Sequence, residues 1–386
     1  MLACESSIDS LDSSLRDEHL RTQTIFHAGN NIMKKIVLTG GGTAGHVTPN
    51  IALVPYLKDA GFDISYIGSY EGMEKGLIEN IGIPYTGISS GKLRRYLDLK
   101  NLSDPFRVIK GYFEAKKHLK SLNPNIVFSK GGFVSVPVVL AARKLHIPVI
   151  IHESDMTPGL ANKIAIPSAT KVCCNFPETV STLPEGKAVL SGSPIRKELL
   201  EGSAQKGKDI CGFDNDKPVI MMTGGSLGSV HINNVLRSIL PTLLEKYQLV
   251  HLCGKGNYDD SLSDKKGYFQ LEYAGEEMAH IYAAAEIVIS RAGANSICEL
   301  LSLVKPNILI PLSAEQSRGD QILNAASFEK QGFSYVIQDN DLTEENLLLA
   351  IDEVYNNKEK YVSTMKQASS SDACKIITDL IVETAL

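Results

Sequence analysis

The sequence lacks tryptophan, CxxC pairs and any apolar run long enough to span a bilayer. Its most apolar stretch, 133–151, is interrupted by Arg143, Lys144 and His146, whereas a spanning helix needs ~20 predominantly apolar residues in succession. The seven cysteines are odd in number and scattered, which excludes a disulfide scaffold and indicates reduced thiols within a core. With a formal net charge of -5, the composition predicts no nucleic-acid partner.

The remaining composition is that of an ordinary globular protein, with 43% hydrophobic and 22% charged residues in a chain of 386. This length has room for two domains. Residues 1–32 differ from the rest because they are polar, rich in Ser and Asp, and without the apolar segment of a secretory signal. We interpret them as a dispensable tail or a start codon placed too far upstream, the alternative being a regulatory or targeting arm.

From Met33 onwards, short β-branched apolar runs such as 35–39, 126–128 and 219–222 alternate with longer amphipathic stretches. Such runs are typical of parallel strands buried on both faces, and the stretches between them are long enough for crossover helices. The pattern predicts an α/β doubly wound architecture.

One pattern, a strand followed by a glycine turn and a helix start, occurs at 36–46 and again at 219–229. Two such openings predict two Rossmann-like domains with parallel sheets that face a cleft, where ligands bind at the carboxyl ends of both sheets. The expected divisions are a first domain at 33–195, a second domain at 196–360, and a C-terminal helix at 361–386 that packs back on the first domain.

The first glycine turn, with Gly40, Gly42 and Gly45, formally matches the dinucleotide-binding fingerprint. That fingerprint also needs an acidic residue at the end of the second strand, and the nearest one, Glu71, comes too late. We therefore expect no nicotinamide cofactor. Glycine turns still let backbone N–H groups approach an anion, so the pair of turns indicates a phosphate-bearing ligand, the alternative being turns that serve packing only.

A series of motifs follows in order along the chain: 41–49 (GGTAGHVTP), 131–133 (GGF), 152–154 (HES), 192–196 (GSPIR), 224–228 (GGSLG), 290–294 (SRAGA) with Glu299, Pro311, and 321–325. In this combination the sequence resembles the MurG family of glycosyltransferases. The resemblance implies a GT-B fold whose second domain holds UDP-N-acetylglucosamine and whose first domain holds a polyprenyl-pyrophosphate-linked muramyl-peptide. It also implies inverting transfer of N-acetylglucosamine to the C4 hydroxyl of the lipid-linked sugar in peptidoglycan biosynthesis.

An inverting transfer needs a base for the acceptor hydroxyl, and two residues are candidates. His46 follows the first glycine loop, and its unperturbed pKa near ~6.5 suits a base at neutral pH, the alternative being a histidine that caps the helix. Glu153 follows the predicted strand at 149–151 and is either the base or a group that orients the acceptor. The loop residues Thr43, Ala44 and Gly45 are expected to contact the substrate.

The second domain is expected to hold the donor. Ser226 and its glycine loop would meet the diphosphate at a helix N-terminus. Arg196 would add a bidentate, permanently charged partner, the alternative being a surface salt bridge. By the resemblance, Glu299 binds the ribose hydroxyls. The remaining donor-site residues are Gly293, Ala294, Asn295 and Ser296, which open a helix toward the diphosphate or sugar, and the amides Gln321 and Asn324, which suit sugar hydroxyls.

No metal ligand set is expected. The segments 214–216 and 339–341 resemble DxD motifs but lie in polar loops, and both read as turns. The chain departs from the family at Asp155 and Asp320, which stand where other members carry amides, and at Ala44, where many carry glycine.

Between Ser90 and Lys120 nine Lys or Arg residues stand against three acidic ones, interleaved with aromatic and leucine residues. Such a mixture suits the surface of an anionic leaflet and predicts peripheral contact with the cytoplasmic face of the cell membrane. The alternative is a solvated helix face whose apolar residues are core.

Three other functions share features with this pattern. A related lipid glycosyltransferase would act on diacylglycerol or another polyprenyl acceptor. A hydrolysing UDP-sugar 2-epimerase would have the same fold without needing the basic segment. A non-catalytic binding subunit would have lost His46, Arg196 or Glu299, all of which are present.

Overall fold

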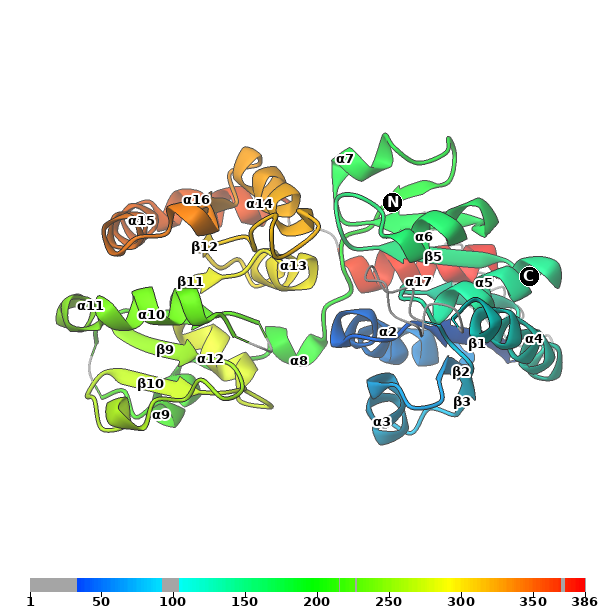
Figure 1. The fold of residues 1–386 in the computed structure, drawn as a ribbon, viewed down its shortest axis with the longest axis horizontal. Coiled ribbons are helices and arrows are strands. Elements are labelled where there is room, and N and C mark those ends of the chain that lie inside the picture. Colours follow the sequence, from blue (N-terminus) through cyan, green and yellow to red (C-terminus); the bar gives the residue numbers. More distant parts are fainter. Residues whose placement is uncertain (1–32, 92–103, 215, 226–227, 369–371, 386) are drawn as a thin grey trace, which may run out of the picture.

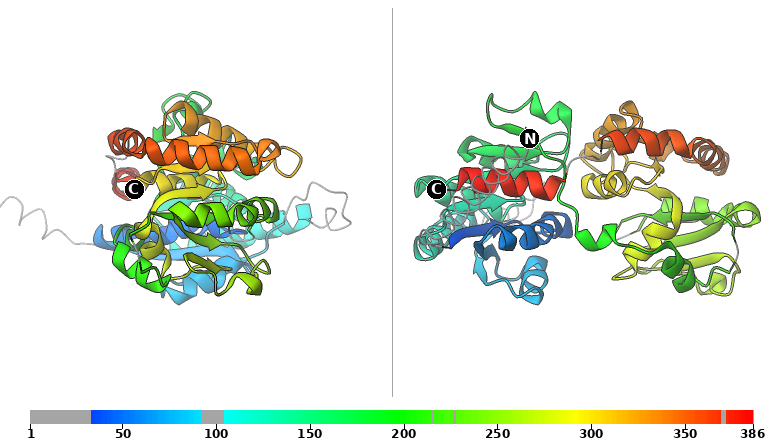
Figure 2. Two further views of the ribbon diagram at one scale, coloured as in Figure 1. Left: turned by 90° about the vertical axis from the view of Figure 1, so that its left-hand side faces the viewer. Right: turned by 180° about the vertical axis from the view of Figure 1, so that it is seen from behind.

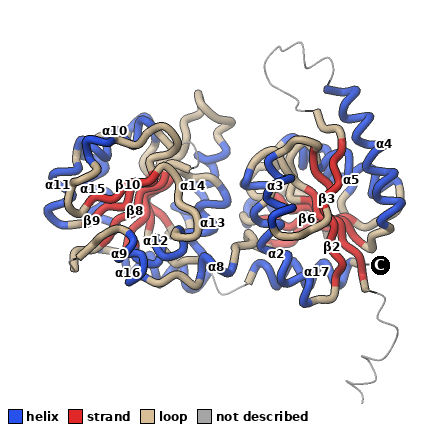
Figure 3. The backbone as a smooth tube through the Cα atoms, turned by 90° about the horizontal axis from the view of Figure 1, so that it is seen from below, coloured by secondary structure: helices blue, strands red, loops and turns tan. Residues whose placement is uncertain are grey.

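The computed structural model describes residues 33–91, 104–214, 216–225, 228–368 and 372–385. Within these residues the chain forms two separate parallel sheets, each covered by helices on both faces, and the two domains lie beside one another (Figure 1, Figure 3). The predicted α/β architecture of two Rossmann-like domains is confirmed. The N-terminal tail at 1–32 lies outside the described residues.

The first sheet, as described, has seven parallel strands in the order β3-β2-β1-β4-β5-β6-β7. Its strands are β1 (Lys34–Thr39), β2 (Phe62–Ser69), β3 (Tyr85–Ile88), β4 (Ile126–Ser129), β5 (Val149–Glu153), β6 (Lys171–Cys174) and β7 (Ala188–Leu190). The helices that cross between or follow them are α2 (Thr48–Asp59), α3 (Met73–Asn80), α4 (Asp104–Leu122), α5 (Ser135–Lys144), α6 (Leu160–Ala165) and α7 (Pro177–Val180), with 3-10 turns η1 (Ala44–His46) and η3 (Ile166–Ser168).

The second sheet has six parallel strands among the described residues, in the order β10-β9-β8-β11-β12-β13. They are β8 (Val219–Thr223), β9 (Gln248–Leu252), β10 (Tyr268–Leu271), β11 (Ala285–Ser290), β12 (Asn307–Leu309) and β13 (Ser334–Val336). The accompanying helices are α8 (Lys197–Leu200), α9 (Ala204–Ile210), α10 (Val230–Ser238), α11 (Leu240–Lys246), α12 (Met278–Ala284), α13 (Ala294–Ser302), α14 (Asp320–Lys330), α15 (Glu344–Asn356) and α16 (Lys358–Ala368), with η4 (Asp260–Leu262) and η5 (Asp339–Asp341).

The order of the strands fixes where ligands can bind. In the first sheet the chain turns back between β1 and β4, and in the second it does so between β8 and β11. Loops that leave neighbouring strands in opposite directions open a crevice at the carboxyl ends of the strands. Both repeated glycine turns, at 40–45 and 224–228, begin at such a point.

The C-terminal segment forms two helices that pack on different domains. Met365 of α16 belongs to a core cluster of the second domain, together with residues such as Leu300. Cys374, Ile377 and Ile381 of α17 (Ala373–Thr384) belong to the core cluster of the first sheet, beside α2 (Figure 2). The chain therefore crosses back to the first domain between the two helices.

We expect Ile377→Ala to lower the free energy of unfolding by about 2–5 kcal/mol, because Ile377 is fully buried between α17 and the first sheet. Val382 lies on the same helix but is exposed, so Val382→Ala is the matched control. Thermal and urea unfolding of both variants measure the difference. Equal stability of the two variants would show that α17 adds no packing energy to the first domain.

Candidate functional site

Two glycine-containing loops of the first domain, at 40–45 after β1 and at 131–133 after β4, lie against each other. A Cβ on Gly132 would lie 2.3 Å from the carbonyl oxygen of Gly41, and its φ of +83° also favours glycine. Glu74, fully buried on α3, holds the first loop, because its Oε2 accepts from the N–H of Gly42 at 3.2 Å and its Oε1 from that of Ser69 at 3.0 Å. The shape of the loops is thus set by close backbone packing and one carboxylate.

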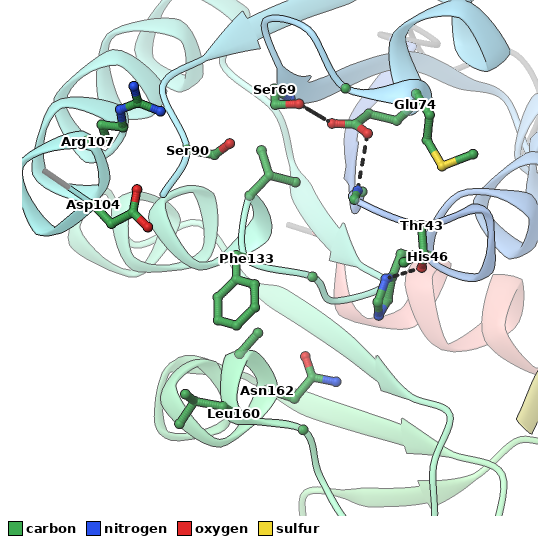
Figure 4. Close-up of a pocket in the computed structure, with 18 of the residues that line it drawn as sticks. Thr43, His46, Ser69, Glu74, Ser90, Asp104, Arg107, Phe133, Leu160 and Asn162 are labelled. Carbon is green, nitrogen blue, oxygen red and sulfur yellow. Dashed lines mark hydrogen bonds between the residues drawn. The ribbon is translucent and has the colours of Figure 1, made fainter. Parts of the chain in front are cut away.

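These loops border a cavity of about 1460 Å³. Its lining runs from Thr43 and His46, past Phe133, to Asp104 and Arg107 on α4 (Figure 4). The second domain contributes residues 315–318 and Asp320 to the lining. The cavity is therefore mainly a feature of the first domain, and its wall includes both candidate bases, His46 and Glu153.

His46 lies in the η1 turn, where its Nδ1 is 2.9 Å from the Thr43 hydroxyl oxygen. When Nδ1 donates this hydrogen bond, the lone pair is on Nε2, which can then accept a proton. Burial is the largest cause that lowers the pKa of His46, and together with the charges of Lys130 and Arg318 it brings this pKa to about 4. The imidazole is therefore neutral near pH 7, the form that a general base requires.

Lys130 places a positive charge beneath these loops. Its side chain is almost fully buried at the end of β4, and its Nζ donates to the hydroxyl of Ser154. Burial lowers the pKa of Lys130 to about 8, while Glu153 and Asp155 act in the opposite direction. Because like charges disfavour each other, this ammonium group helps to keep His46 uncharged.

Glu153 ends β5 and is held by the loop that follows. Its carboxylate accepts from the N–H of Asp155 at 3.0 Å, the N–H of Gly159 at 3.1 Å and the Asn162 amide at 2.8 Å. Burial raises its pKa, and these hydrogen bonds oppose the shift. The geometry fits a carboxylate that orders residues 153–162 at the edge of the cavity.

Asn324 joins the two domains. Its Nδ2 donates to Asp155 Oδ1 at 3.1 Å and its Oδ1 accepts from the N–H of Met156 at 3.0 Å. The side chain is fully buried, its Nδ2 also donates to the carbonyl oxygen of Ala292 at 3.3 Å, and the residue is not part of the cavity lining. Gln321 likewise accepts from the N–H of Leu312 at 3.0 Å and lies outside the cavity lining.

A second contact between the domains involves the first glycine loop. Asn295 of α13 donates from Nδ2 to the carbonyl oxygen of Gly45 at 3.0 Å. A Cβ on Gly45 would lie 2.6 Å from that nitrogen, so glycine permits this approach. Thr43 and Ala44 in the same loop are exposed, and Thr43 lines the cavity.

Arg196 and Glu299 lie together, although they are far apart in the sequence. Both line a small pocket of about 10 Å³ with Ser193, Pro194 and Asn295, between the start of α8 and the side of α13. Burial raises the pKa of Glu299 to about 7, and the Arg196 charge opposes the shift. The structure therefore brings the predicted ribose carboxylate and the predicted diphosphate cation to one place.

Arg291 contacts two loops that follow strands of the second sheet. Arg291 donates to the Ser229 hydroxyl at 2.8 Å and forms an ion pair with Asp339 at 2.5 Å. Ser229 caps α10, directly after the second glycine loop, in which a Cβ on Gly228 would lie 2.0 Å from the carbonyl oxygen of Cys253. Ser226 of that loop lies outside the described residues.

The start of α13 follows β11 directly. Gly293 is its N-cap, and Ala294 and Ser296 belong to its first turn. These residues leave backbone N–H groups at the carboxyl end of the second sheet, where the order of strands reverses.

In the part of the chain that the structure describes, no group of three or more His, Cys, Asp or Glu residues could hold a metal ion. The two DxD-like segments also have other contacts: Asp339 pairs with Arg291, and Asp214 lies 3.4 Å from Lys266.

The model of the glycosyltransferase family 28 N-terminal domain matches residues 36–174, and that of the C-terminal domain matches residues 219–380. The chain is 64% identical over 354 residues to a UDP-N-acetylglucosamine--N-acetylmuramyl-(pentapeptide) pyrophosphoryl-undecaprenol N-acetylglucosamine transferase of Lachnoclostridium phytofermentans, covering 92% of this chain and 100% of that protein. A protein of the same name from Lachnospira eligens is also 64% identical, over 90% of this chain and 99% of its own length. The crystal structure of Acinetobacter baumannii MurG superimposes with a TM-score of 0.70 at 27% identity, covering 91% of this chain and 99% of that one. The chain belongs to the MurG family.

MurG proteins share the GT-B fold with more distant enzymes. A UDP-GlcNAc 2-epimerase from Methanocaldococcus jannaschii has a TM-score of 0.63 at 15% identity, covering 91% of this chain and 100% of that one. This likeness concerns the fold alone. The family matches support the glycosyltransferase and add no support for the alternative functions.

The MurG motifs in the sequence left several cavity residues unassigned. Glu74 and Asp104 line the cavity but belong to no motif, and Arg107 and Lys110 were expected only as part of a basic segment. No pattern in the sequence marks them, because their place in the site depends on how α3 and α4 pack beside the glycine loops.

The outward face of α4 carries apolar side chains. Phe106 and Phe113 are 74% and 62% exposed, and Ile109 between them is also exposed. The four basic residues Lys92, Arg94, Arg95 and Lys100 of the same basic segment lie outside the described residues. Among the helices that are described, none combines the length and the apolar character needed to cross a bilayer.

Proposed function

We propose that this protein transfers N-acetylglucosamine from UDP-GlcNAc to the C4 hydroxyl of undecaprenyl-pyrophosphoryl-MurNAc-pentapeptide in peptidoglycan biosynthesis, converting lipid I to lipid II. The observation that carries the proposal is 64% identity over essentially the full length of two transferases named for this reaction. It is supported by a cavity in the first domain beside His46 and by the small pocket that Arg196 and Glu299 both line.

The reaction is a single displacement in which the acceptor oxygen attacks the anomeric carbon and UDP leaves with the bonding electron pair. His46 Nε2 takes the proton from the C4 hydroxyl as the new bond forms. The neutral state of His46 near pH 7 supports this assignment over Glu153, whose carboxylate is occupied by donors of its own loop. Glu153 is then a positioning residue that orders the loop at 153–162.

The donor lies on the second domain. Glu299 accepts hydrogen bonds from the ribose hydroxyls, and Arg196 faces the diphosphate together with the Gly293–Ser296 backbone and the Ser226 loop. Charge-assisted donors of this kind stabilise the negative charge that develops on the leaving diphosphate. Gln321 and Asn324 reach the sugar only if they exchange their present partners, Leu312, Asp155 and Met156.

Transfer to muramyl-pentapeptide lipid and to diacylglycerol should be compared with the same radiolabelled UDP-GlcNAc. We expect transfer only to the muramyl-pentapeptide lipid. Labelled glycolipid from diacylglycerol, with none from the muramyl lipid, would contradict the proposed acceptor and leave the donor assignment standing.

The protein is expected to bind peripherally to the cytoplasmic face of the membrane through the outward face of α4. The side chains of Phe106, Ile109 and Phe113 would enter the membrane interface. The basic residues Lys116, Lys117 and Lys120 of the same helix would contact anionic head groups. The proposal involves no nucleic acid.

The double variant Phe106→Ser, Phe113→Ser is expected to weaken binding to vesicles with anionic phospholipid at least tenfold, because each buried aromatic ring contributes ~1.5–3 kcal/mol. Co-sedimentation with vesicles measures the change. Leu349→Ser is the control, because Leu349 is 60% exposed on α15 of the second domain. Equal binding by the double variant and the control would remove α4 as the membrane contact.

A further inference from the structure

Two basic residues of α4 line the cavity at the end that lies away from His46. Arg107 and Lys110 are three residues apart and so share one side of the helix. Among the described residues no carboxylate lies within ion-pair distance of Arg107. Lys110 is 3.7 Å from Glu114, whose other oxygen accepts from the N–H of Ser89 at 2.6 Å.

The other basic groups in the lining are already occupied or uncharged. Arg318, from the second domain, lies 2.6 Å from Asp320, and His46 is neutral near pH 7. Asp104 and Glu114 place two negative charges on the same stretch of α4, and Glu114 is the one near Lys110. Arg107 is the cation at this end of the cavity that no carboxylate of the described residues pairs, so its guanidinium can bind an anion.

The two ends of the cavity match the two ends of the acceptor sugar. Figure 4 shows His46 and Arg107 on opposite sides, with Phe133 between them. In a pyranose ring, C4 and C1 lie across the ring from each other, so a sugar with its C4 hydroxyl at His46 directs the group on C1 toward α4. The exposed side chains of Phe106, Ile109 and Phe113 lie on the same helix.

We propose that Arg107 and Lys110 form the subsite for the diphosphate of the lipid-linked acceptor. The diphosphate then lies between the sugar at His46 and a polyprenyl chain that continues along the exposed face of α4. This inference rests on the proposed function for the identity of the acceptor. Phosphates of bilayer head groups have the same chemistry, and the experiment must distinguish the two sources.

The double variant Arg107→Ala, Lys110→Ala is to be assayed with a short-chain, water-soluble muramyl-pentapeptide diphosphate acceptor in the absence of vesicles. We expect the KM for this acceptor to rise about 10- to 100-fold, because hydrogen bonds from charged groups to phosphate are lost. The KM for UDP-GlcNAc should not change. Lys144→Ala is the control, because Lys144 is an exposed lysine at the end of α5 and outside the cavity lining.

An acceptor analogue with one phosphate in place of two tests whether the two residues contact the diphosphate. For the wild type the KM for this analogue should be higher than the KM for the diphosphate acceptor. For the double variant the KM values for the two acceptors should be similar. If replacing two phosphates by one raised the KM equally in the wild type and the double variant, the proposed subsite would be wrong. It would also be wrong if an unchanged KM for the soluble acceptor came together with weaker binding to anionic vesicles, since the two residues would then serve head groups.

Binding of farnesyl diphosphate, measured calorimetrically without donor, separates this inference from the proposed function. If the wild type transfers sugar to the muramyl lipid but the double variant binds farnesyl diphosphate as tightly as the wild type, the subsite is wrong and the function stands. If the wild type binds farnesyl diphosphate through Arg107 and Lys110 but transfers nothing to the muramyl lipid, the subsite stands and the acceptor is wrong.

Discussion

Replacing His46 by alanine is expected to lower kcat for sugar transfer by about 10²- to 10⁴-fold, the usual contribution of a general base. The residue lines the cavity, its Nδ1 is held by Thr43, and its imidazole is neutral at pH 7. The KM for UDP-GlcNAc should change little, because His46 belongs to the first domain. Steady-state kinetics with saturating donor and acceptor measure the effect.

Two comparisons make this result specific. His118→Ala, on α4 and outside the cavity lining, should keep wild-type kcat. Glu153→Gln should reduce kcat less than His46→Ala, because Glu153 orders a loop. A larger loss from Glu153→Gln than from His46→Ala would make Glu153 the base.

The pH dependence of kcat follows from the same pKa. A base must be unprotonated, and burial together with the charges of Lys130 and Arg318 lowers the pKa of His46 to about 4. Activity at saturating substrate should therefore persist as the pH falls through ~6.5, where an unperturbed histidine would be half protonated. A loss of kcat centred near pH 6.5 would contradict this assignment.

Replacing Glu299 by alanine is expected to raise the KM for UDP-GlcNAc about 10- to 100-fold, because a carboxylate that accepts hydrogen bonds from ribose hydroxyls is lost. Glu299 lies with Arg196 in the small pocket beside α13. The kcat at saturating donor should stay close to that of the wild type. Glu329→Ala, at an exposed position on α14, is the matched control.

Glu299 should also make donor affinity depend on pH. Burial raises its pKa to about 7, so the carboxyl is protonated below pH 7 and charged above it. The charged form accepts hydrogen bonds more strongly, so the KM for UDP-GlcNAc should fall as the pH rises through 7. Glu299→Gln should remove this dependence. If the KM for UDP-GlcNAc depended on pH equally in the wild type and in Glu299→Gln, another titrating group would cause the dependence.

The fold was predictable because the sequence pattern that indicates it is short, continuous in the chain and present twice. The strand, glycine turn and helix start at 36–46 and 219–229 each report a parallel α/β unit, and both lie where the strand order reverses. The limits 33–195 and 196–360 stay predictions. The C-terminal segment, expected as one helix, forms α16 and α17, which pack on different domains. Their separation depends on tertiary contacts that helical periodicity does not encode.

Parts of the site were predictable for a different reason. The resemblance named Arg196 and Glu299, and the structure brings them together in one pocket. The partners of Asn324 were not predictable, because Asp155 is 169 residues away and meets it only where the two domains touch. Lys130 directly precedes the motif at 131–133, and nothing in the sequence marks it as part of the site. Only the packed structure shows its charge buried beneath the loops.

The most direct test of the proposed function is to identify the product that the wild type forms from UDP-GlcNAc and the short-chain muramyl-pentapeptide diphosphate lipid. Nuclear magnetic resonance of the purified product gives both the position and the anomeric configuration of the new linkage. We expect a single N-acetylglucosamine joined β-1,4 to the muramyl sugar, as direct displacement with inversion requires. An α linkage, attachment at another hydroxyl, or conversion of UDP-GlcNAc to its 2-epimer without transfer would contradict the proposed reaction.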